Sequence, residues 1–351
     1  MGSEMCIRDR LRMRSKAAVL VESRQPLQVL DLELSEDLNP GQVLVKMDLA
    51  GLCGSQIGEI DAVKGVDQYL PHLLGHEGVG LVLKVGPGVT RVKEGERVLA
   101  HWMRGRGQSA RPAIYTHELY GKINSGQIAI FSQFAIVSED RLSPISEGID
   151  RQIAAITGCA LLTAYGVLVN ELKIEQGASS PLLVVGFGGI GESIALMAQA
   201  IRPLEVYVIE PREVAAAKAA SLGFRVVSRA DLSNLEFDWA VDTSGAPESI
   251  EVAYEALSAR GTLSLVGVTP KGSTISIDPM PLHYGRTLQG SFGGSVEVDR
   301  DLPKLIDLIT SMNGSLESLI GDIYQLSEIN VAIEKFRQGT SSGRSLIDLS
   351  L

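Results

Sequence analysis

Apolar and polar residues alternate along several short segments between residues 16 and 100. These segments are separated by turn-forming stretches such as NPG and GPG. Alternation with a period of two, bounded by proline and glycine, is typical of β-strands that bury one face. We therefore predict an all-β or barrel-like region, with strands in KAAVLVE, LQVLDLEL, QVLVKMDLAG, GVGLVLKVG and ERVLAHW. Residues 101–127 are irregular, polar and basic, which predicts a long surface loop.

The pattern changes from about residue 160, where continuously apolar runs alternate with alanine-rich helical stretches. Examples are LLVV followed by IGESIALMAQAI, and EVYVIE followed by REVAAAKAASLG. Strands that are apolar throughout are typical of a parallel sheet covered by helices on both faces. From about residue 293 two helical stretches precede a short β-like run, RSLIDLSL, which is free to return to the first region.

Composition excludes several classes of protein. The chain has 351 residues, of which 45% are apolar and 21% charged, and this is typical of a globular protein of about two domains. The formal net charge of −10 disfavours nucleic acid as a partner. The apolar run at residues 153–169 contains Gly, Thr and Tyr and is shorter than a membrane span, so we assign it to the protein interior.

Three cysteines, Cys6, Cys53 and Cys159, are too few for a disulfide framework and indicate a reducing compartment, which we take to be the cytoplasm. Residues 1–15 are basic and lack the apolar core of a secretory signal. We interpret them as a non-native or disordered leader, either vector-derived or a misplaced start. An arginine-rich organelle-targeting peptide is the alternative.

Residues 186–191 read GFGGIG, a G-x-G-x-x-G motif that follows an apolar strand and begins a helix. In that context the pattern indicates a dinucleotide-binding turn, with Gly189 and Ile190 inside it. Gly186 allows the tight turn, Gly188 lets the backbone approach a pyrophosphate, and Gly191 permits close packing of helix and strand. The next strand ends at Glu210, whose carboxylate suits ribose hydroxyls and favours NAD over NADP. Arg212 is the counter-evidence, because a guanidinium there suits a 2′-phosphate.

Candidate metal ligands are sparse. The stretch LLGHEGVG places His76 and Glu77 between glycines, and Cys53 and Cys159 are the only cysteines beyond the leader. Two thiolates and an imidazole are a common ligand set for zinc. The three residues lie far apart in sequence, so spacing alone leaves two interpretations open: zinc ligands, or buried cysteines and a turn histidine.

A resemblance to a known family favours the first interpretation. The segment GHEGVGLVLKVGPGV resembles the zinc signature of the medium-chain alcohol dehydrogenases, as do Cys53 in AGLCGSQ and Cys159 before Thr163-Ala164-Tyr165-Gly166. The similarity continues through IFSQFAIV, VVGFGGIG, VGVTP and YGRTLQGSFGG. It implies an α/β protein with two domains. A GroES-like β-barrel catalytic domain would comprise residues 16–160 and 293–351, and a doubly wound Rossmann domain residues 161–292.

The resemblance also implies the chemistry. One catalytic zinc would be held by Cys53, His76 and Cys159, with Glu77 behind it, and would act as a Lewis acid on an alcohol whose hydride passes to NAD. Ser55 would relay the proton, and Trp102 would form a wall of the substrate pocket. Thr163, Ile190, Val266, Val268 and Phe292 match positions that line the nicotinamide site. The family further implies a homodimer or homotetramer that contacts its copy at the strand around 287–292.

Several positions depart from the family pattern. Residues 101–127 contain no cysteine, so we expect no structural zinc. The family's aspartate after the relay hydroxyl is Gln56 here, and its relay histidine is Gly58. Its arginine in the last strand is matched by Ile347, although Arg344 lies nearby.

Two other functions stay open. One is a zinc-free, NADPH-dependent quinone or enoyl reductase of the same superfamily, and the other is a nucleotide-binding protein without catalysis. The basic loop also has two interpretations, a solvated surface or a collector of anionic substrates. Its charged residues are Arg104, Arg106, Arg111 and Lys122, with Glu118 opposing them.

Overall fold

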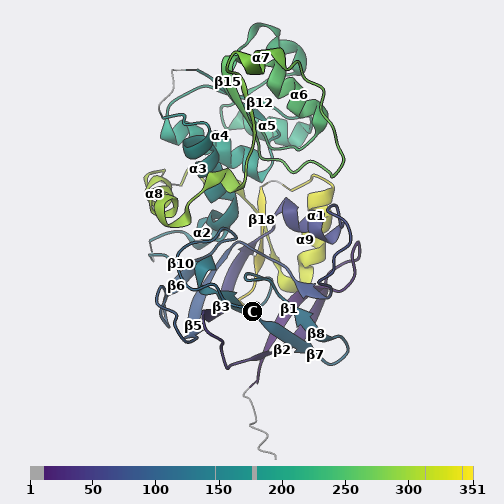
Figure 1. Ribbon diagram of the computed structural model, residues 1–351, viewed down its shortest axis with the longest axis vertical. Helices are drawn as coiled ribbons and strands as arrows, with labels where there is room; N and C mark the ends of the chain where they lie inside the picture. The colour runs from purple at the N-terminus through teal and green to yellow at the C-terminus, as the bar shows by residue number, and fades with distance from the viewer. Residues whose placement is uncertain (1–11, 147, 176–179, 313, 342, 351) are drawn as a thin grey trace, which may run out of the picture.

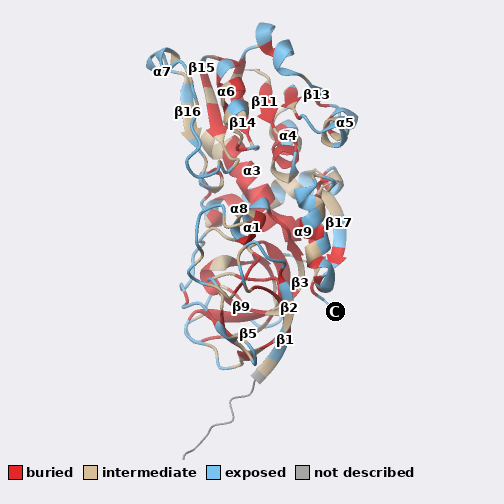
Figure 2. Ribbon diagram, turned by 90° about the vertical axis from the view of Figure 1, so that its right-hand side faces the viewer, coloured by how far each residue is buried: buried red, intermediate tan, exposed pale blue. Residues whose placement is uncertain are grey.

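The computed structural model describes residues 12–146, 148–175, 180–312, 314–341 and 343–350. A β-rich part and an α/β part are stacked along the long axis of the molecule (Figure 1). Buried residues form the interior of both parts, and helix α3 (Leu162–Gly166) between them is buried as well (Figure 2). The predicted combination of a barrel region with a doubly wound sheet is confirmed. The exact boundaries of the two domains stay a prediction.

The β-rich part contains a closed five-stranded barrel. Its first strand begins at Arg12, so the last four residues of the predicted leader, 12–15, form part of this strand. Ser15 in that stretch is buried and its hydroxyl donates to the carbonyl of Phe134 at 3.2 Å. Residues 1–11, including Cys6, lie outside the described residues. The barrel strands are β1 (Arg12–Leu20), β2 (Gln28–Ser35), β7 (Ile114–His117), β8 (Gly121–Asn124) and β4 (His72–Leu73).

Strands β7 and β8 correct a second expectation, because they lie inside the segment predicted to be a long surface loop. Each strand has four residues and each buries one large side chain completely, Tyr115 in β7 and Ile123 in β8. A strand is recognised in a sequence by several alternating apolar positions, and one buried side chain per strand does not give that alternation. The polar and basic positions around them face outward.

A second sheet carries the residues that reach the candidate site. Its order is β10–β6–β5–β3–β18–β17, and β9 also pairs with β3. Strand β18 runs antiparallel to β3, with Leu346 opposite Gly51, so the end of the chain returns to the β-rich part. The strands are β3 (Gln42–Gly51), β5 (Gly78–Val85), β6 (Arg97–Ala100), β9 (Phe134–Ser138), β10 (Leu142–Pro144), β17 (Ile320–Gln325) and β18 (Arg344–Asp348).

The α/β part is a six-stranded sheet in which every pairing is parallel, in the order β13–β12–β11–β14–β15–β16. The chain order reverses at β11, and ligands of such sheets bind beyond the carboxyl ends of the strands at that reversal. The strands are β11 (Leu182–Val185), β12 (Val206–Ile209), β13 (Arg225–Val226), β14 (Phe237–Asp242), β15 (Leu257–Leu265) and β16 (Thr287–Gly290). The accompanying helices are α4 (Gly189–Ile201), α5 (Glu213–Ser221), α6 (Pro247–Glu255) and α7 (Met280–His283).

A continuous helical segment, Arg151–Glu171, joins the two parts. By length and composition alone its 21 residues suffice to cross a membrane, so the sequence-based length argument was wrong. However, 89% of its most apolar stretch is buried inside the protein, which confirms the assignment to the interior. It consists of α2 (Arg151–Ile156), a π-helical turn (Thr157–Leu161), α3 (Leu162–Gly166) and a second π-helical turn (Val167–Glu171). The remaining helices are α1 (Gly54–Ile60), α8 (Val298–Ser311) and α9 (Ile329–Arg337).

Candidate metal and dinucleotide site

The three predicted metal ligands meet in space. One ligand atom each of Cys53, His76 and Cys159 lies within 4.8 Å of the other two, although 23 and 83 residues separate them along the chain. Cys53 is the N-cap of α1, directly after β3. His76 precedes β5, and Cys159 lies in the π-helical turn between α2 and α3. Both cysteines are buried and free, and His76 is partly exposed.

Glycine is required beside His76. Gly75 has a φ of +98°, and a β-carbon on it would lie 2.8 Å from the backbone nitrogen of Phe131. Any other residue would therefore be strained and would collide with backbone. The glycine lets the chain turn sharply enough to place the imidazole beside the two sulfurs. The Gly75-His76 pair of the family signature therefore has a local steric cause.

The two site cysteines shift each other's pKa in opposite directions. A hydrogen bond with Cys159 lowers the pKa of Cys53 well below its ordinary value, and the same contact with Cys53 raises the pKa of Cys159 well above it. Burial alone lowers the pKa of His76, but its contact with Cys53 and the charges of Cys53 and Glu77 outweigh burial and raise it. Two buried thiolates beside an imidazole need a compensating cation, and this donor set fits zinc.

Glu77 lies behind this cluster and is completely buried. Its Oε2 accepts from the backbone N–H of Ala160 at 3.1 Å, one residue after the third candidate ligand. Its Oε1 accepts from the Nε of Arg344 at 2.7 Å and from a second guanidinium nitrogen. Burial raises the pKa of Glu77 overall, and the arginine charge opposes that shift.

Arg344 corrects the interpretation of the last strand. The resemblance to the family placed its arginine at Ile347, but Ile347 is a fully buried core residue of β18. Arg344, three residues earlier, is the arginine that reaches the candidate site. The charges of Cys53, Glu77 and Cys159 raise its pKa despite its burial. A signal was available in the sequence, because Arg344 is the only arginine in the predicted final strand.

Two polar residues of α1 contact the cluster directly. The hydroxyl of Ser55 donates to the sulfur of Cys53 at 3.3 Å, so the predicted relay hydroxyl lies beside the candidate metal. The buried side chain of Gln56 bridges two candidate ligands, contacting the backbone N–H of Cys53 and the Nδ1 of His76. The sequence identified Gln56 only as a departure, and its contacts became apparent only in the fold.

A second group of potential ligands lies nearby, formed by Glu59, Asp67 and His72. The Nε2 of His72 is 2.7 Å from the Asp67 carboxylate, and its Nδ1 is 3.0 Å from the carbonyl of Leu73. Both ring nitrogens therefore already have oxygen partners within the protein. With no sulfur ligand and with Glu59 exposed, this group is the weaker candidate.

The glycine motif lies where the sequence placed it, between β11 and α4, at the reversal in strand order. Gly188 is the N-cap of α4, and a β-carbon on Gly191 would lie 2.1 Å from the carbonyl oxygen of Gly186. That distance excludes every other residue at position 191. A β-carbon on Gly189 would lie 3.5 Å from the Cδ of Arg344, so the arginine that pairs with Glu77 also borders this turn.

Glu210 follows β12 and contacts the same turn, because its Oε2 accepts from the backbone N–H of Phe187 at 2.7 Å. Arg212 folds back on it and donates to both carboxylate oxygens at 2.9 Å. Burial opposes ionisation of Glu210, but these contacts outweigh it and lower its pKa. Glu210, which favours NAD, and Arg212, which suits the 2′-phosphate of NADP, are thus ion-paired with each other.

Some of the residues predicted to line the substrate and nicotinamide pockets lie close to one another. The rings of Trp102 and Phe292 are 5.2 Å apart in an edge-to-face arrangement, and the Phe292 side is exposed. A β-carbon on Gly294, two residues after Phe292, would touch the carbonyl of Thr163. Val268 is exposed in the turn after β15, and Val266 directly follows that strand. Ile190 lies in the first turn of α4.

Sequence analysis did not identify one aromatic residue beside the cluster, Phe336 of α9. Its ring tip would lie 3.1 Å from a β-carbon on Gly54, the residue after Cys53. It is exposed and comes from a helix near the end of the chain, so only the fold reveals its position.

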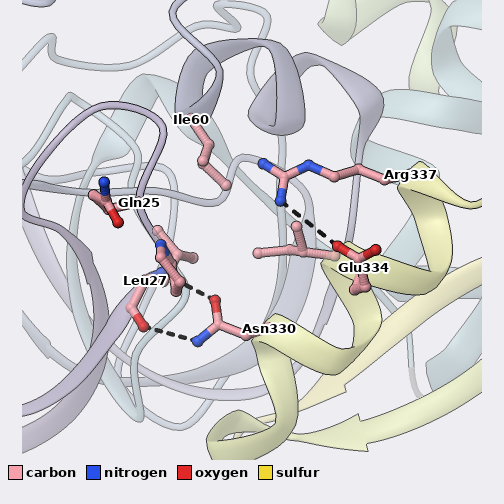
Figure 3. A pocket seen from close by; sticks show the side chains of 8 residues that line it. Gln25, Leu27, Ile60, Asn330, Glu334 and Arg337 are labelled. Carbon is pink, nitrogen blue, oxygen red and sulfur yellow. Dashed lines mark hydrogen bonds and ion pairs between the residues drawn. The ribbon is translucent and has the colours of Figure 1, made fainter.

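A small cavity of about 90 Å³ lies between α9 and the start of β2, lined by Gln25, Leu27, Ile60 and Arg337 among others. There the side chain of Asn330 bridges the backbone N–H and carbonyl of Leu27 (Figure 3). None of the predicted site residues lines it. The cavity is therefore a packing feature behind α1 rather than part of the candidate site.

Carboxylates hold the loop that precedes β7. Glu139 accepts from the backbone N–H groups of Thr90, Arg91 and Gln108, and Asp299 accepts from that of Arg106. Arg104 is paired with the buried Asp140 at 3.0 Å. Arg104 is thus ion-paired within the protein while its side chain stays largely exposed, which favours the solvated-surface interpretation of the loop over the anion-collecting one.

Comparisons with known proteins agree with this geometry. The model of the alcohol dehydrogenase GroES-like domain matches residues 39–147, and that of the zinc-binding dehydrogenase domain matches residues 189–311. Alcohol dehydrogenase 6 of Peromyscus maniculatus is 26% identical over 366 aligned residues, which cover 93% of this chain and 96% of that protein.

Solved structures share the fold over nearly the whole chain. Benzyl alcohol dehydrogenase from Acinetobacter calcoaceticus superposes with a TM-score of 0.84 at 22% identity, covering 96% of this chain and 99% of that one. Acetophenone reductase from Geotrichum candidum, solved in complex with NAD, gives a TM-score of 0.76 at 22% identity, covering 95% and 97%. The chain belongs to the zinc-type medium-chain dehydrogenase/reductase family.

Proposed function

We propose that this protein is a zinc-dependent dehydrogenase that interconverts an alcohol and its aldehyde or ketone, with NAD as the hydride carrier. The observation that carries the proposal is the convergence of Cys53, His76 and Cys159 in one cluster. Arg344 links that cluster to the glycine turn through its contacts with Glu77 and Gly189. The two matched domain models and the alcohol dehydrogenase relatives support the same reaction class.

When bound by these three residues, zinc would supply Lewis acidity to a substrate oxygen. The hydroxyl of Ser55 lies next to Cys53 and is partly open to solvent, so it is placed to accept the alcohol proton and pass it outward. Trp102 and Phe292 present aromatic surface that suits an apolar substrate carbon skeleton. Arg344 holds the carboxylate of Glu77 behind the ligands, which fixes the charge next to the metal.

For the coenzyme we propose NAD. The Glu210 carboxylate is held at the glycine turn by Phe187, in the position where a ribose hydroxyl can donate to it. Its negative charge repels a 2′-phosphate, and its ion pair with Arg212 keeps that guanidinium from serving as a phosphate ligand.

We also propose that the protein is a homodimer or homotetramer and acts in a reducing compartment such as the cytoplasm. Strand β16 is an edge of the parallel sheet among the described strands, and pairs with β15. Met280, Leu282 and Tyr284 expose apolar surface on the segment just before it. An exposed edge beside apolar side chains suits pairing with a second copy. The two site cysteines are free thiols, which fits a reducing compartment.

The test is NADH formation, followed by absorbance, when zinc-loaded protein is mixed with NAD and a panel of primary, secondary and polyhydric alcohols. The proposal predicts turnover with at least one alcohol and its loss in a folded Cys53→Ala variant. Turnover that survives a strong chelator and prefers NADPH would instead identify a zinc-free reductase. A zinc-loaded protein that is silent across the whole panel would favour a nucleotide-binding protein without catalysis.

A further inference from the structure

Gln56 is hydrogen-bonded to two of the three candidate zinc ligands at once. Its side chain is buried on α1, with Oε1 2.8 Å from the backbone N–H of Cys53 and Nε2 3.2 Å from the Nδ1 of His76. The first contact belongs to the start of the helix, because Gln56 is the third residue of α1 and returns to its N-cap. The second contact reaches across to the residue that precedes β5.

The donors and acceptors fix the orientation of this carboxamide. A backbone N–H only donates, so the Cys53 N–H must face the amide oxygen. The amide NH₂ group, which also only donates, is then the group that faces His76. Nδ1 of His76 must therefore accept, and a neutral ring with an accepting Nδ1 carries its hydrogen on Nε2. With Nδ1 occupied by Gln56, Nε2 is the nitrogen left for a metal.

Zinc needs the opposite tautomer. A neutral imidazole that gives its Nε2 lone pair to a metal carries its hydrogen on Nδ1, and that hydrogen normally points at an acceptor such as a carboxylate or carbonyl. In this protein it would point at the NH₂ group of Gln56. Rotation of the amide by half a turn gives the Nδ1–H of His76 an acceptor oxygen. The same rotation turns the NH₂ group toward the Cys53 N–H, so that two donors face each other there. In this geometry the amide oxygen faces one of the two N–H groups and the NH₂ group faces the other, so only one of them finds an acceptor.

We propose that Gln56 is a positioning residue that weakens zinc binding, because the zinc-bound state loses one of its two hydrogen bonds. The ion is then exchangeable instead of permanently held. This proposal rests on the proposed zinc function. A glutamate at position 56 has two acceptor oxygens of the same reach and satisfies both N–H groups of the zinc-bound state. It also preserves the start of the helix, because glutamate is as suitable as glutamine at the third helical position.

The experiment measures zinc affinity and release directly. Wild type and Gln56→Glu are stripped of metal, and the dissociation constant for zinc is determined by competition with a chromophoric chelator. Release of zinc to excess chelator gives the exchange rate. We expect Gln56→Glu to bind zinc about 10- to 100-fold more tightly, the usual effect of a partner that orients a metal-bound histidine, and to release it correspondingly more slowly. Equal or weaker affinity in a folded Gln56→Glu protein would overturn the proposal.

A second measurement does not depend on any variant at position 56. In the metal-free wild type at pH 9, side-chain ¹⁵N NMR reports which nitrogen of His76 carries hydrogen, with the signal assigned by its absence in His76→Gln. We expect hydrogen on Nε2, and a change to Nδ1 when zinc is added. Hydrogen on Nδ1 in the metal-free protein contradicts the proposal. A wild type that binds no zinc at all contradicts the proposed function itself, which separates the two failures.

Discussion

The Nε of Arg344 donates to the Oε1 of Glu77 at 2.7 Å, although 267 positions separate the two residues along the chain. Both side chains are buried, and Glu77 is also held by the backbone of Ala160. Because Arg344 also lies against Gly189, it borders the candidate metal cluster and the glycine turn together. Pairing of β18 with β3 creates this relationship, so the end of the chain helps to build the site.

Replacement of Arg344 by methionine should be strongly destabilising. It leaves the buried charge of Glu77 without a partner, and breaking a buried pair in this way costs about 3–5 kcal/mol of unfolding free energy. Urea denaturation of the metal-free protein measures the effect. The matched control is Arg229→Met, which breaks an exposed pair with Glu255 and should cost at most about 1 kcal/mol. Equal effects of the two substitutions would contradict the structural role of Arg344.

His101 should make the protein less stable in mild acid. The side chain is fully buried between the carbonyl of Met103 and the hydroxyl of Ser143, and burial lowers its pKa to about 4 from an ordinary value of 6.5. As the pH falls, the unfolded chain therefore takes up this proton first, and stability is lost between pH 6.5 and about 4. From this residue we expect a decrease of about 2 kcal/mol between pH 7.5 and pH 5.

Chemical denaturation at the two pH values checks this expectation for His101. His101→Gln keeps a donor for Met103 but does not titrate, so its unfolding free energy should decrease less than that of the wild type. The same decrease in both proteins would show that other groups cause the acid sensitivity.

The ion pair between Glu210 and Arg212 predicts how coenzyme choice responds to substitution. Removal of the carboxylate in Glu210→Ala frees the guanidinium for a 2′-phosphate and removes the repulsion, so NADPH should bind about tenfold more tightly, a change of about 1.4 kcal/mol. Arg212→Ala should instead widen the preference for NADH. Fluorescence titration with both reduced coenzymes measures these affinities. Unchanged NADPH binding in both variants would place the 2′-hydroxyl elsewhere.

Association of subunits should depend on the surface beside β16. Tyr284 is exposed next to this edge strand, and a glutamate in its place adds a charge to the proposed contact. Light scattering should show a dimer or tetramer for the wild type and a smaller species for Tyr284→Glu. Val214→Glu is the matched control, because Val214 is similarly exposed on α5 and should leave the assembly unchanged. A monomeric wild type would contradict the proposal.

Strand β11 and the glycine turn after it were predictable because their signals are local. Four consecutive buried residues in β11, followed by Gly186, indicate a buried parallel strand and a tight turn from the residues alone. The meeting of Cys53, His76 and Cys159 was different, since no spacing rule joins residues so far apart. Only the resemblance to a family predicted it.

The sequence did not predict the contacts that the C-terminal elements make with the candidate site. Arg344 and Phe336 reach the site from the last elements, and their positions depend on the pairing of β18 and the packing of α9. The sequence showed that Gln56 departs from the family's aspartate. Its two hydrogen bonds, however, depend on how α1 and the turn at His76 are placed relative to each other. Strands β7 and β8 were missed because each has a single buried side chain as its signal.

Binding of zinc by Cys53, His76 and Cys159 is measured by the zinc content of the purified, zinc-reconstituted protein, determined by elemental analysis for the wild type and for Cys159→Ala. We expect one zinc ion per wild-type chain and none in the folded variant, because two of the three ligands alone do not hold the ion through gel filtration. A wild type that retains no zinc, or a variant that retains as much as the wild type, would contradict it.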